Sequence, residues 1–146
     1  MRNNYDDIVS DNFHIFEHIN QGIRYYDQRE YDLAIESYQK SIAIDPEYAS
    51  VYGWLGLTYS KQEKYDLAVR FFQKAISIDP EDGWYHYNLA CVYSIQGKRQ
   101  ICIESLWKAI SLDRNYIKMV EENSDFDNIR ESPEYFEKVA TIFVYG

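Results

Sequence analysis

The sequence repeats itself with a period of 34 residues, and this period constrains the fold more than any other feature. Segments 15–48 and 49–82 are identical at 14 of 34 aligned positions. A third segment continues the alignment at matched positions: Gly22, Gly56 and Ala90; Tyr25, Tyr59 and Tyr93; Ala34, Ala68 and Cys102; Asp45, Asp79 and Asp113. A period of this length is typical of stacked helical hairpins. The sequence therefore predicts an all-α solenoid of three helix-turn-helix repeats, at about residues 15–48, 49–82 and 83–116.

The repeated positions also follow a recognisable pattern of residue types. A small residue is followed by Tyr three residues later, by a second small residue nine further on, by an aromatic residue four later and by a closing Pro. The second repeat carries Leu55, Gly56, Tyr59, Ala68, Phe72, Ala75 and Pro80, and the first carries Gly22, Tyr25, Ala34, Tyr38 and Pro46. This pattern resembles the tetratricopeptide repeat (TPR). The third repeat departs from it at Cys102 and Arg114, and the resemblance implies the fold while leaving the function open.

The repeats divide the chain into a flexible N-terminal arm at residues 1–11 and one TPR domain at residues 12–146. Helices are predicted at about 12–28, 31–44, 49–62, 65–78, 82–96 and 98–112. Beyond residue 116 the period fades, and residues 117–146 are predicted to form a degenerate C-terminal cap. Ser132 and Pro133 are typical of the start of a helix. The last unit of a stacked array needs a polar outer face, a role that this acidic end fits.

Composition narrows the range of partners. The formal net charge of −9 argues against nucleic acid and against an anionic membrane surface, because both would repel the chain. The first residues lack a secretory signal, and no apolar stretch approaches the ~18 residues of a membrane span. The two cysteines, Cys91 and Cys102, fit unpaired structural thiols in a reducing compartment. We therefore expect a cytoplasmic location.

Residue types that support catalysis do not form a recognisable constellation. His14 and His18 are spaced as two zinc ligands on one helix face, but the sequence offers no third ligand nearby. His18, Tyr52 and His86 occupy one repeat position, which favours a packing role. No glycine-rich phosphate loop and no paired nucleophile and base are recognisable. The sequence predicts a protein that is not an enzyme, with no catalytic residues, metal or cofactor.

The first helix of each repeat carries more apolar residues than one partner helix covers. The TPR resemblance implies that these helices line a concave face, and exposed apolar patches of this kind usually bind other molecules. Trp54 and Trp84 are the strongest candidates for anchor residues. Packing between repeats is the alternative role for any single member. Removing the packing positions leaves a candidate peptide-binding groove of Phe16, Ile19, Ile23, Tyr26, Trp54, Leu57, Trp84, Tyr87, Asn88 and Cys91.

The inner positions also indicate the kind of ligand. TPR proteins that hold the acidic C-termini of heat-shock chaperones use Lys, Asn and Arg there, whereas this chain has Ile19, Ile23, Trp54, Trp84 and Asn88. An apolar groove favours an extended apolar peptide or an amphipathic helix. In this the chain looks more like repeat chaperones that shield translocator proteins before bacterial secretion. The alternative hypothesis is self-association, for example as a homodimer, in which Tyr5, Ile8 and Val9 or residues 142–145 fill the groove of the same or a neighbouring chain.

Overall fold

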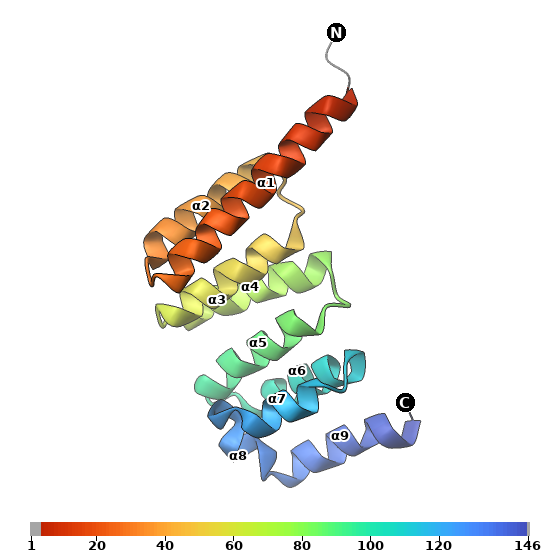
Figure 1. Ribbon diagram of the computed structural model, residues 1–146. Helices are drawn as coiled ribbons and strands as arrows, with labels where there is room; N and C mark the ends of the chain where they lie inside the picture. Colours follow the sequence, from red (N-terminus) through yellow and green to blue (C-terminus); the bar gives the residue numbers. More distant parts are fainter. Residues whose placement is uncertain (1–3, 146) are drawn as a thin grey trace.

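The computed structural model describes residues 4–145, which form helices and no β-strand (Figure 1). Three helical hairpins stack in chain order, and a smaller C-terminal unit packs on the third. This confirms the predicted all-α solenoid. The elements are α1 (Asn4–Asp27), α2 (Tyr31–Ile44), α3 (Ala49–Lys61), α4 (Tyr65–Ile78), α5 (Gly83–Ile95), α6 (Arg99–Leu112), α7 (Tyr116–Glu122), the 3-10 turn η1 (Ser124–Phe126), α8 (Asp127–Arg130) and α9 (Pro133–Tyr145).

Each hairpin is closed by the same local interactions at the end of its second helix. The carboxylates of Asp45, Asp79 and Asp113 accept hydrogen bonds from the backbone N–H two residues further on, at 2.9, 3.3 and 2.9 Å. Tyr52 donates its hydroxyl to the Pro46 carbonyl at 2.6 Å, and His86 Nε2 lies 3.0 Å from the Pro80 carbonyl oxygen. The shared position of Tyr52 and His86 therefore holds the connection between hairpins.

Within the first two hairpins, a glycine receives an aromatic ring from the partner helix. A Cβ added at Gly22 would lie 2.4 Å from the Tyr38 ring, and one added at Gly56 would lie 2.9 Å from the Phe72 ring. Both rings are fully buried. In the third hairpin Ala90 occupies the glycine position, and the Cys102 thiol donates to the Ala90 carbonyl at 3.3 Å. These contacts set the close approach of the two helices.

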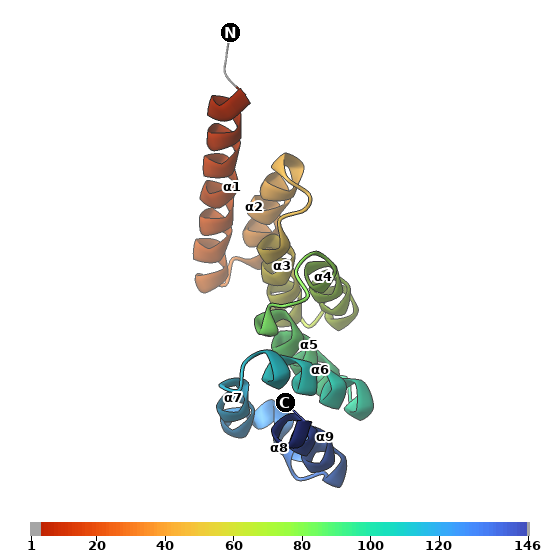
Figure 2. The same ribbon diagram turned by 90° about the vertical axis from the view of Figure 1, so that its right-hand side faces the viewer.

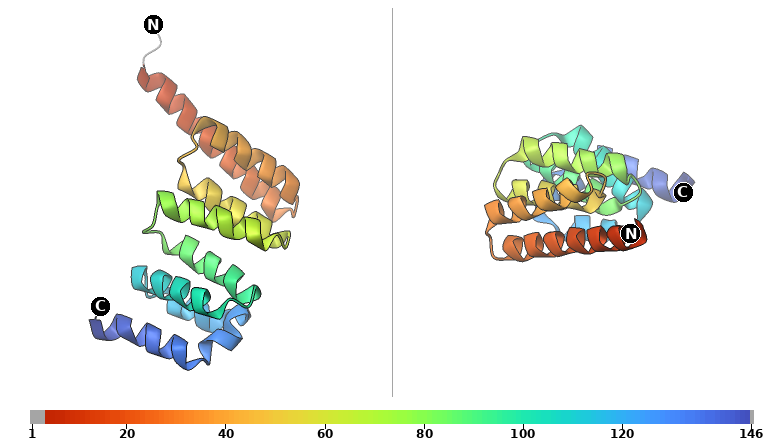
Figure 3. Two further views of the ribbon diagram at one scale, coloured as in Figure 1. Left: turned by 180° about the vertical axis from the view of Figure 1, so that it is seen from behind. Right: turned by 90° about the horizontal axis from the view of Figure 1, so that it is seen from above.

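The first helix begins earlier than the sequence indicated. Helix α1 runs from Asn4, so residues 4–11 are helical rather than an irregular arm, and the predicted start near residue 12 is wrong. Asp6 and Asp7 lie in its first turn, where carboxylates favour the free N–H groups and the positive end of the helix dipole. Residues 1–3 of the predicted arm lie outside the described residues. Helix α1 thus projects past the end of α2 (Figures 1 and 3).

The C-terminal unit follows the predicted start signal. Helix α9 begins at Pro133, and the Ser132 hydroxyl accepts a hydrogen bond from the Tyr135 N–H at 3.3 Å. Helix α9 packs on α6, where the Trp107 indole donates to Thr141 Oγ1 at 3.0 Å. Its outer side is not polar as expected of a cap, because Phe136 and Phe143 are exposed. The η1 turn contacts α5, and α7 contacts α6.

We predict that Gly56→Ala destabilises the protein by about 1–3 kcal/mol, because the new methyl group overlaps the buried Phe72 ring. A Gly-to-Ala change inside a helix normally stabilises the protein, so a loss of stability for Gly56→Ala would indicate the steric overlap. Urea unfolding measures the change. Ala43→Gly on the exposed side of α2 calibrates the propensity effect, and a Gly56→Ala, Phe72→Leu double variant should lose less than the sum of the single losses. A stabilised Gly56→Ala variant would contradict the overlap.

The turns inside the three hairpins use one left-handed residue each, spaced by 34 residues. These are Arg29, Glu63 and Gly97, with φ of 63°, 60° and 71°. We predict that Gly97→Ala costs about 1 kcal/mol of stability, although nothing lies within 4 Å of the added Cβ. Glu63→Gly should stay within about 0.5 kcal/mol, because relieved strain offsets the added chain entropy. Thermal unfolding of both variants measures this, and equal losses would rule out backbone strain as the cause.

Candidate binding groove

The first helices of the hairpins share one face of the molecule. Helix α1 contacts α3, and α3 contacts α5. Helix α7 lies on the same side at the C-terminal end of the stack, while α4 and α6 form the opposite side (Figure 2). The candidate groove is therefore bounded by α1 at one end and by α7 and η1 at the other, with α3 and α5 between them.

A ladder of aromatic rings crosses this face from one hairpin to the next. The ring of Tyr26 lies 5.8 Å from that of Trp54, and Trp54 lies 5.6 Å from Trp84. Gly53 makes room, because a Cβ there would lie 2.7 Å from Trp84 Cζ3. All three residues are only partly buried. Each tryptophan therefore packs between hairpins and keeps part of its surface exposed.

The C-terminal half of the groove contains a hollow of about 290 Å³ between α3, α5 and η1. Its walls include Leu57, Asn88 and Cys91 of the predicted set. The chain's own C-terminal unit closes one side, because Asn123 Nδ2 donates to the Tyr87 hydroxyl at 2.9 Å and to Cys91 Sγ at 3.7 Å. Asn88 is fixed by its own bond to the Trp84 carbonyl at 2.8 Å.

The predicted residues do not all reach the surface. Phe16 is half exposed and meets the Tyr48 ring edge-on at 5.7 Å. Ile23 is partly buried. Ile19 is only 6% exposed and belongs to the core of the first two hairpins, so it packs rather than lines the groove. Tyr87 is 8% exposed, because Tyr116 and Phe126 cover its ring.

Six further residues line the hollow that the sequence prediction left out: Ser60, Lys61, Phe72, Ile95, Asn123 and Asp125. Lys61 and Ile95 occupy the repeat position of Asp27, so the 34-residue alignment places them at equivalent points of α3 and α5. Asn123 and Asp125 follow the last repeat and have no counterpart in the alignment. Only the fold of the C-terminal unit brings them to α5.

The thiol in the groove is a poor nucleophile. Burial, followed by the charge of Asp125, raises the pKa of Cys91 to about 12. Burial also raises the pKa of Cys102 to about 12, and the two cysteines are not disulfide-bonded. A thiol that stays protonated at neutral pH neither attacks a substrate nor binds a metal well. Cys91 therefore offers the groove a small apolar surface.

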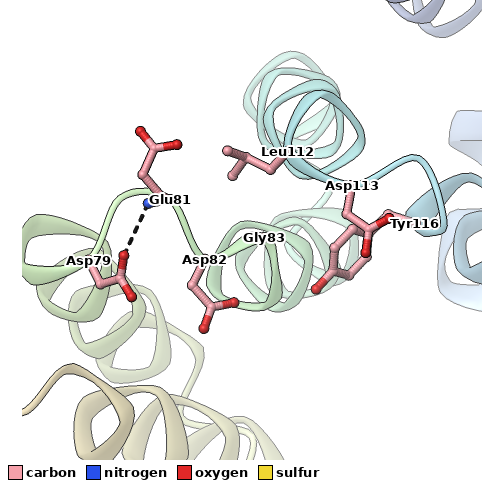
Figure 4. A pocket seen from close by; sticks show the side chains of 7 residues that line it. All are labelled: Asp79, Glu81, Asp82, Gly83, Leu112, Asp113 and Tyr116. Atoms are coloured by element: carbon pink, nitrogen blue, oxygen red, sulfur yellow. Dashed lines mark hydrogen bonds between the residues drawn. The ribbon is translucent and has the colours of Figure 1, made fainter.

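A separate, open hollow of about 430 Å³ lies between the turns that follow α4 and α6 (Figure 4). Asp79, Glu81, Asp82 and Asp113 surround it. Three of these carboxylates accept hydrogen bonds from backbone N–H groups, since Asp79 and Asp113 close their turns and Asp82 caps α5. The carboxylates are thus engaged in the local structure of the turns, and the hollow results from the shape of the repeated turn.

Within residues 4–145, no group of three or more His, Cys, Asp or Glu side chains is arranged to hold a metal ion. His14 lies 3.5 Å from Glu17 on the exposed side of α1. No helix in this part of the chain is long and apolar enough to cross a membrane.

The sequence matches family profiles over its repeats. A profile described as "TPR repeat" matches residues 22–63, and profiles described as "Tetratricopeptide repeat" match residues 49–82 and 71–103. Together with the stacked hairpins, these matches show that the chain belongs to the tetratricopeptide repeat family. This confirms the resemblance seen in the repeat positions. No curated protein matches the sequence.

Solved structures share the fold at low identity. MamA superimposes with a TM-score of 0.71 at 23% identity, covering 97% of this chain and 85% of MamA. The TPR2B domain of yeast Sti1, solved as a complex with pHsp70, gives 0.68 at 18%, covering 92% and 99%. The first TPR domain of Spaghetti (RPAP3), bound to the HSP90 peptide SRMEEVD, gives 0.67 at 14%, covering 90% and 91%.

We predict that Cys91 in a Cys102→Ala background reacts with iodoacetamide at a rate that rises about tenfold per pH unit from pH 8 to pH 10. A raised pKa keeps the thiolate a minor species over this window. A free cysteine peptide, with a pKa near 8.5, should level off below pH 10. Mass spectrometry of the adduct measures the rate, with circular dichroism confirming the fold. A plateau near pH 9 for Cys91 would contradict the burial of its sulfur.

Proposed function

We propose that the chain is a non-enzymatic protein-interaction module, acting as a scaffold or chaperone-like adaptor. Its ligand is an apolar peptide segment or an amphipathic helix held in the concave groove. One observation carries this proposal: Tyr26, Trp54 and Trp84 form a ladder of ring contacts between hairpins, and all three residues remain partly exposed. Partly exposed tryptophans that are already held rigidly are suited to anchor a ligand at low entropic cost.

The inner surface favours apolar side chains over a ligand carboxylate. Two structural neighbours were solved with an HSP90 peptide or with pHsp70. The groove of this chain instead presents Phe16, Ile23, Trp54, Leu57 and Trp84, and Lys61 is the only cationic side chain lining the hollow beside them. Asn88 supplies one polar group to the lining of this hollow. A single lysine is not a clamp for two carboxylates, so the expected ligand differs from an acidic C-terminus.

Self-association is the second candidate. The chain already folds its own C-terminal unit against Tyr87 and Cys91, which supports the ability of the groove to accept a chain segment. Phe143, Val144 and Tyr145 at the end of α9 are 55%, 70% and 87% exposed. In this alternative, such a segment from a second copy fills the groove. Light scattering across a concentration series separates a monomer with a free groove from an assembly.

A peptide selection tests the leading proposal. Peptides enriched from a random displayed library against the purified chain should carry apolar residues at helical spacing. Leu57→Lys should weaken their binding at least tenfold, about 1.4 kcal/mol, by fluorescence anisotropy. Trp84→Ala should act likewise, provided that urea unfolding shows the variant folded. Ile101→Lys on the opposite side, where Ile101 is 48% exposed, is the matched control. An equal loss of peptide affinity in the Ile101→Lys control, or no loss of affinity in Leu57→Lys, would reject the groove as the binding site.

A further inference from the structure

An uncovered apolar stripe runs along the N-terminal half of α1. Tyr5, Val9, Phe13 and Phe16 are 73%, 51%, 65% and 50% exposed. At the angular spacing of an α-helix, these four side chains fall within about 80° of arc. Solvent-facing helices rarely carry four large apolar residues in one line, and a stripe of this kind usually meets another helix.

The second helix of the hairpin does not cover this stripe. Helix α2 ends at Ile44, and Ser41 in its last turn bonds to the Ile15 carbonyl at 3.1 Å. The turns of α1 before Phe13 therefore have no part of α2 opposite them. Figure 1 shows α1 projecting beyond the stack at this point.

One edge of the stripe faces the groove. Phe16 and Ile23 occupy the repeat positions of Trp84 and Cys91, and Cys91 lines the hollow of the groove. At helical spacing Phe13 lies at the other edge of the stripe, next to the end of the stack. The face of α1 that a preceding hairpin would cover corresponds to Val51, Leu55 and Thr58 of α3, which are buried. In α1 those positions hold Glu17, Gln21 and Arg24, and Arg24 donates to Gln21 at 2.6 Å. The end of the stack is therefore polar, whereas the stripe beside it is apolar and exposed.

Charge decides which kind of helix fits the stripe. Residues 4–20 contain Asp6, Asp7, Asp11 and Glu17 and no Lys or Arg. At helical spacing, Asp6 and Glu17 border the stripe next to Phe13. Pairing α1 with α1 of a second copy would bring eight carboxylates together, which opposes such a dimer. A helix with basic residues beside its apolar face is attracted by the same charges.

We propose that α1 extends the groove into a docking surface for a basic amphipathic helix of a partner protein. The helix lies along α1, places its apolar side chains on Tyr5, Val9, Phe13 and Phe16, and directs Lys or Arg towards Asp6 and Glu17. This inference rests on the proposed function, because it specifies the ligand of the same face. It adds a binding surface outside the three repeats and a charge requirement.

Two labelled model peptides of about 18 residues test the proposal against the full chain. Both carry Leu along one helical face, and the remaining positions are Lys in one peptide and Glu in the other. Fluorescence anisotropy should show at least tenfold tighter binding of the Leu/Lys peptide, with affinity falling as salt is added. The double variant Val9→Gln, Phe13→Gln should weaken the Leu/Lys peptide at least tenfold. Gln keeps the helix propensity and the charge of α1.

The matched control is Leu33→Gln, Ile101→Gln, which changes two residues of similar exposure on α2 and α6. Its affinity should stay within about twofold of the parent. A loss in the control equal to that in α1 would mean non-specific attraction to an acidic protein and would overturn the proposal. So would equal binding of the Glu peptide, or a dimer seen by light scattering that the α1 variant abolishes. If library peptides respond to Leu57→Lys but not to the α1 variant, the groove stands and this extension alone fails.

Discussion

The seating of an aromatic ring on a glycine is the contact on which the first two hairpins depend. Gly22 and Gly56 let Tyr38 and Phe72 lie against the backbone of the neighbouring helix, so that each ring is fully buried. With the helices this close, the small residues Ala34 and Ala68 are also buried. The hairpin core is then filled by few side chains. The remaining large apolar residues of α1, α3 and α5 must lie between hairpins or on the inner face.

That distribution explains why the tryptophans pack between hairpins and still keep part of their surface exposed. Trp54 and Trp84 contact each other across adjacent hairpins, and the absence of a side chain at Gly53 lets the Trp84 ring approach α3. A solenoid is stabilised mainly by such contacts between neighbouring units. The same residues remain partly exposed, which supports the proposed role of their rings in holding a ligand. Preorganised aromatic surface of this kind binds at a lower entropic cost than mobile side chains would.

Much of the fold was predictable because the repeat carries its signals locally. The residues that close each hairpin, such as Asp45 and Pro46, end α2 within the bounds that the sequence indicated. The start of α1 was not predictable in this way, because Ser10, Asp11 and Asn12 are themselves good capping residues and mask a helix that continues through them. No other helix covers these first turns of α1, so packing gives no second signal for where the helix begins.

The groove was predictable only where it follows the period. Phe16, Trp54 and Trp84 keep part of their surface exposed, whereas Ile19 is buried in the core, as are Gly53 and Tyr87 at the same repeat position. The placement of Asn123 on Tyr87 depends on how α7 and η1 fold back, which no periodic signal encodes.

The two ends of the inner face differ in a way that gives the groove a direction. At the C-terminal end the chain covers its own aromatic surface, with Phe126 and Tyr116 over Tyr87 and with Asn123 satisfying the polar groups there. At the N-terminal end the equivalent surface of α1 stays open and is bordered by carboxylates. The α1 end carries four carboxylates and no Lys or Arg over residues 4–20, whereas Lys61 and Asp125, of opposite charge, both line the hollow at the other end. Orientation of a ligand would therefore come from electrostatics at α1, and the strength of binding from the aromatic ladder.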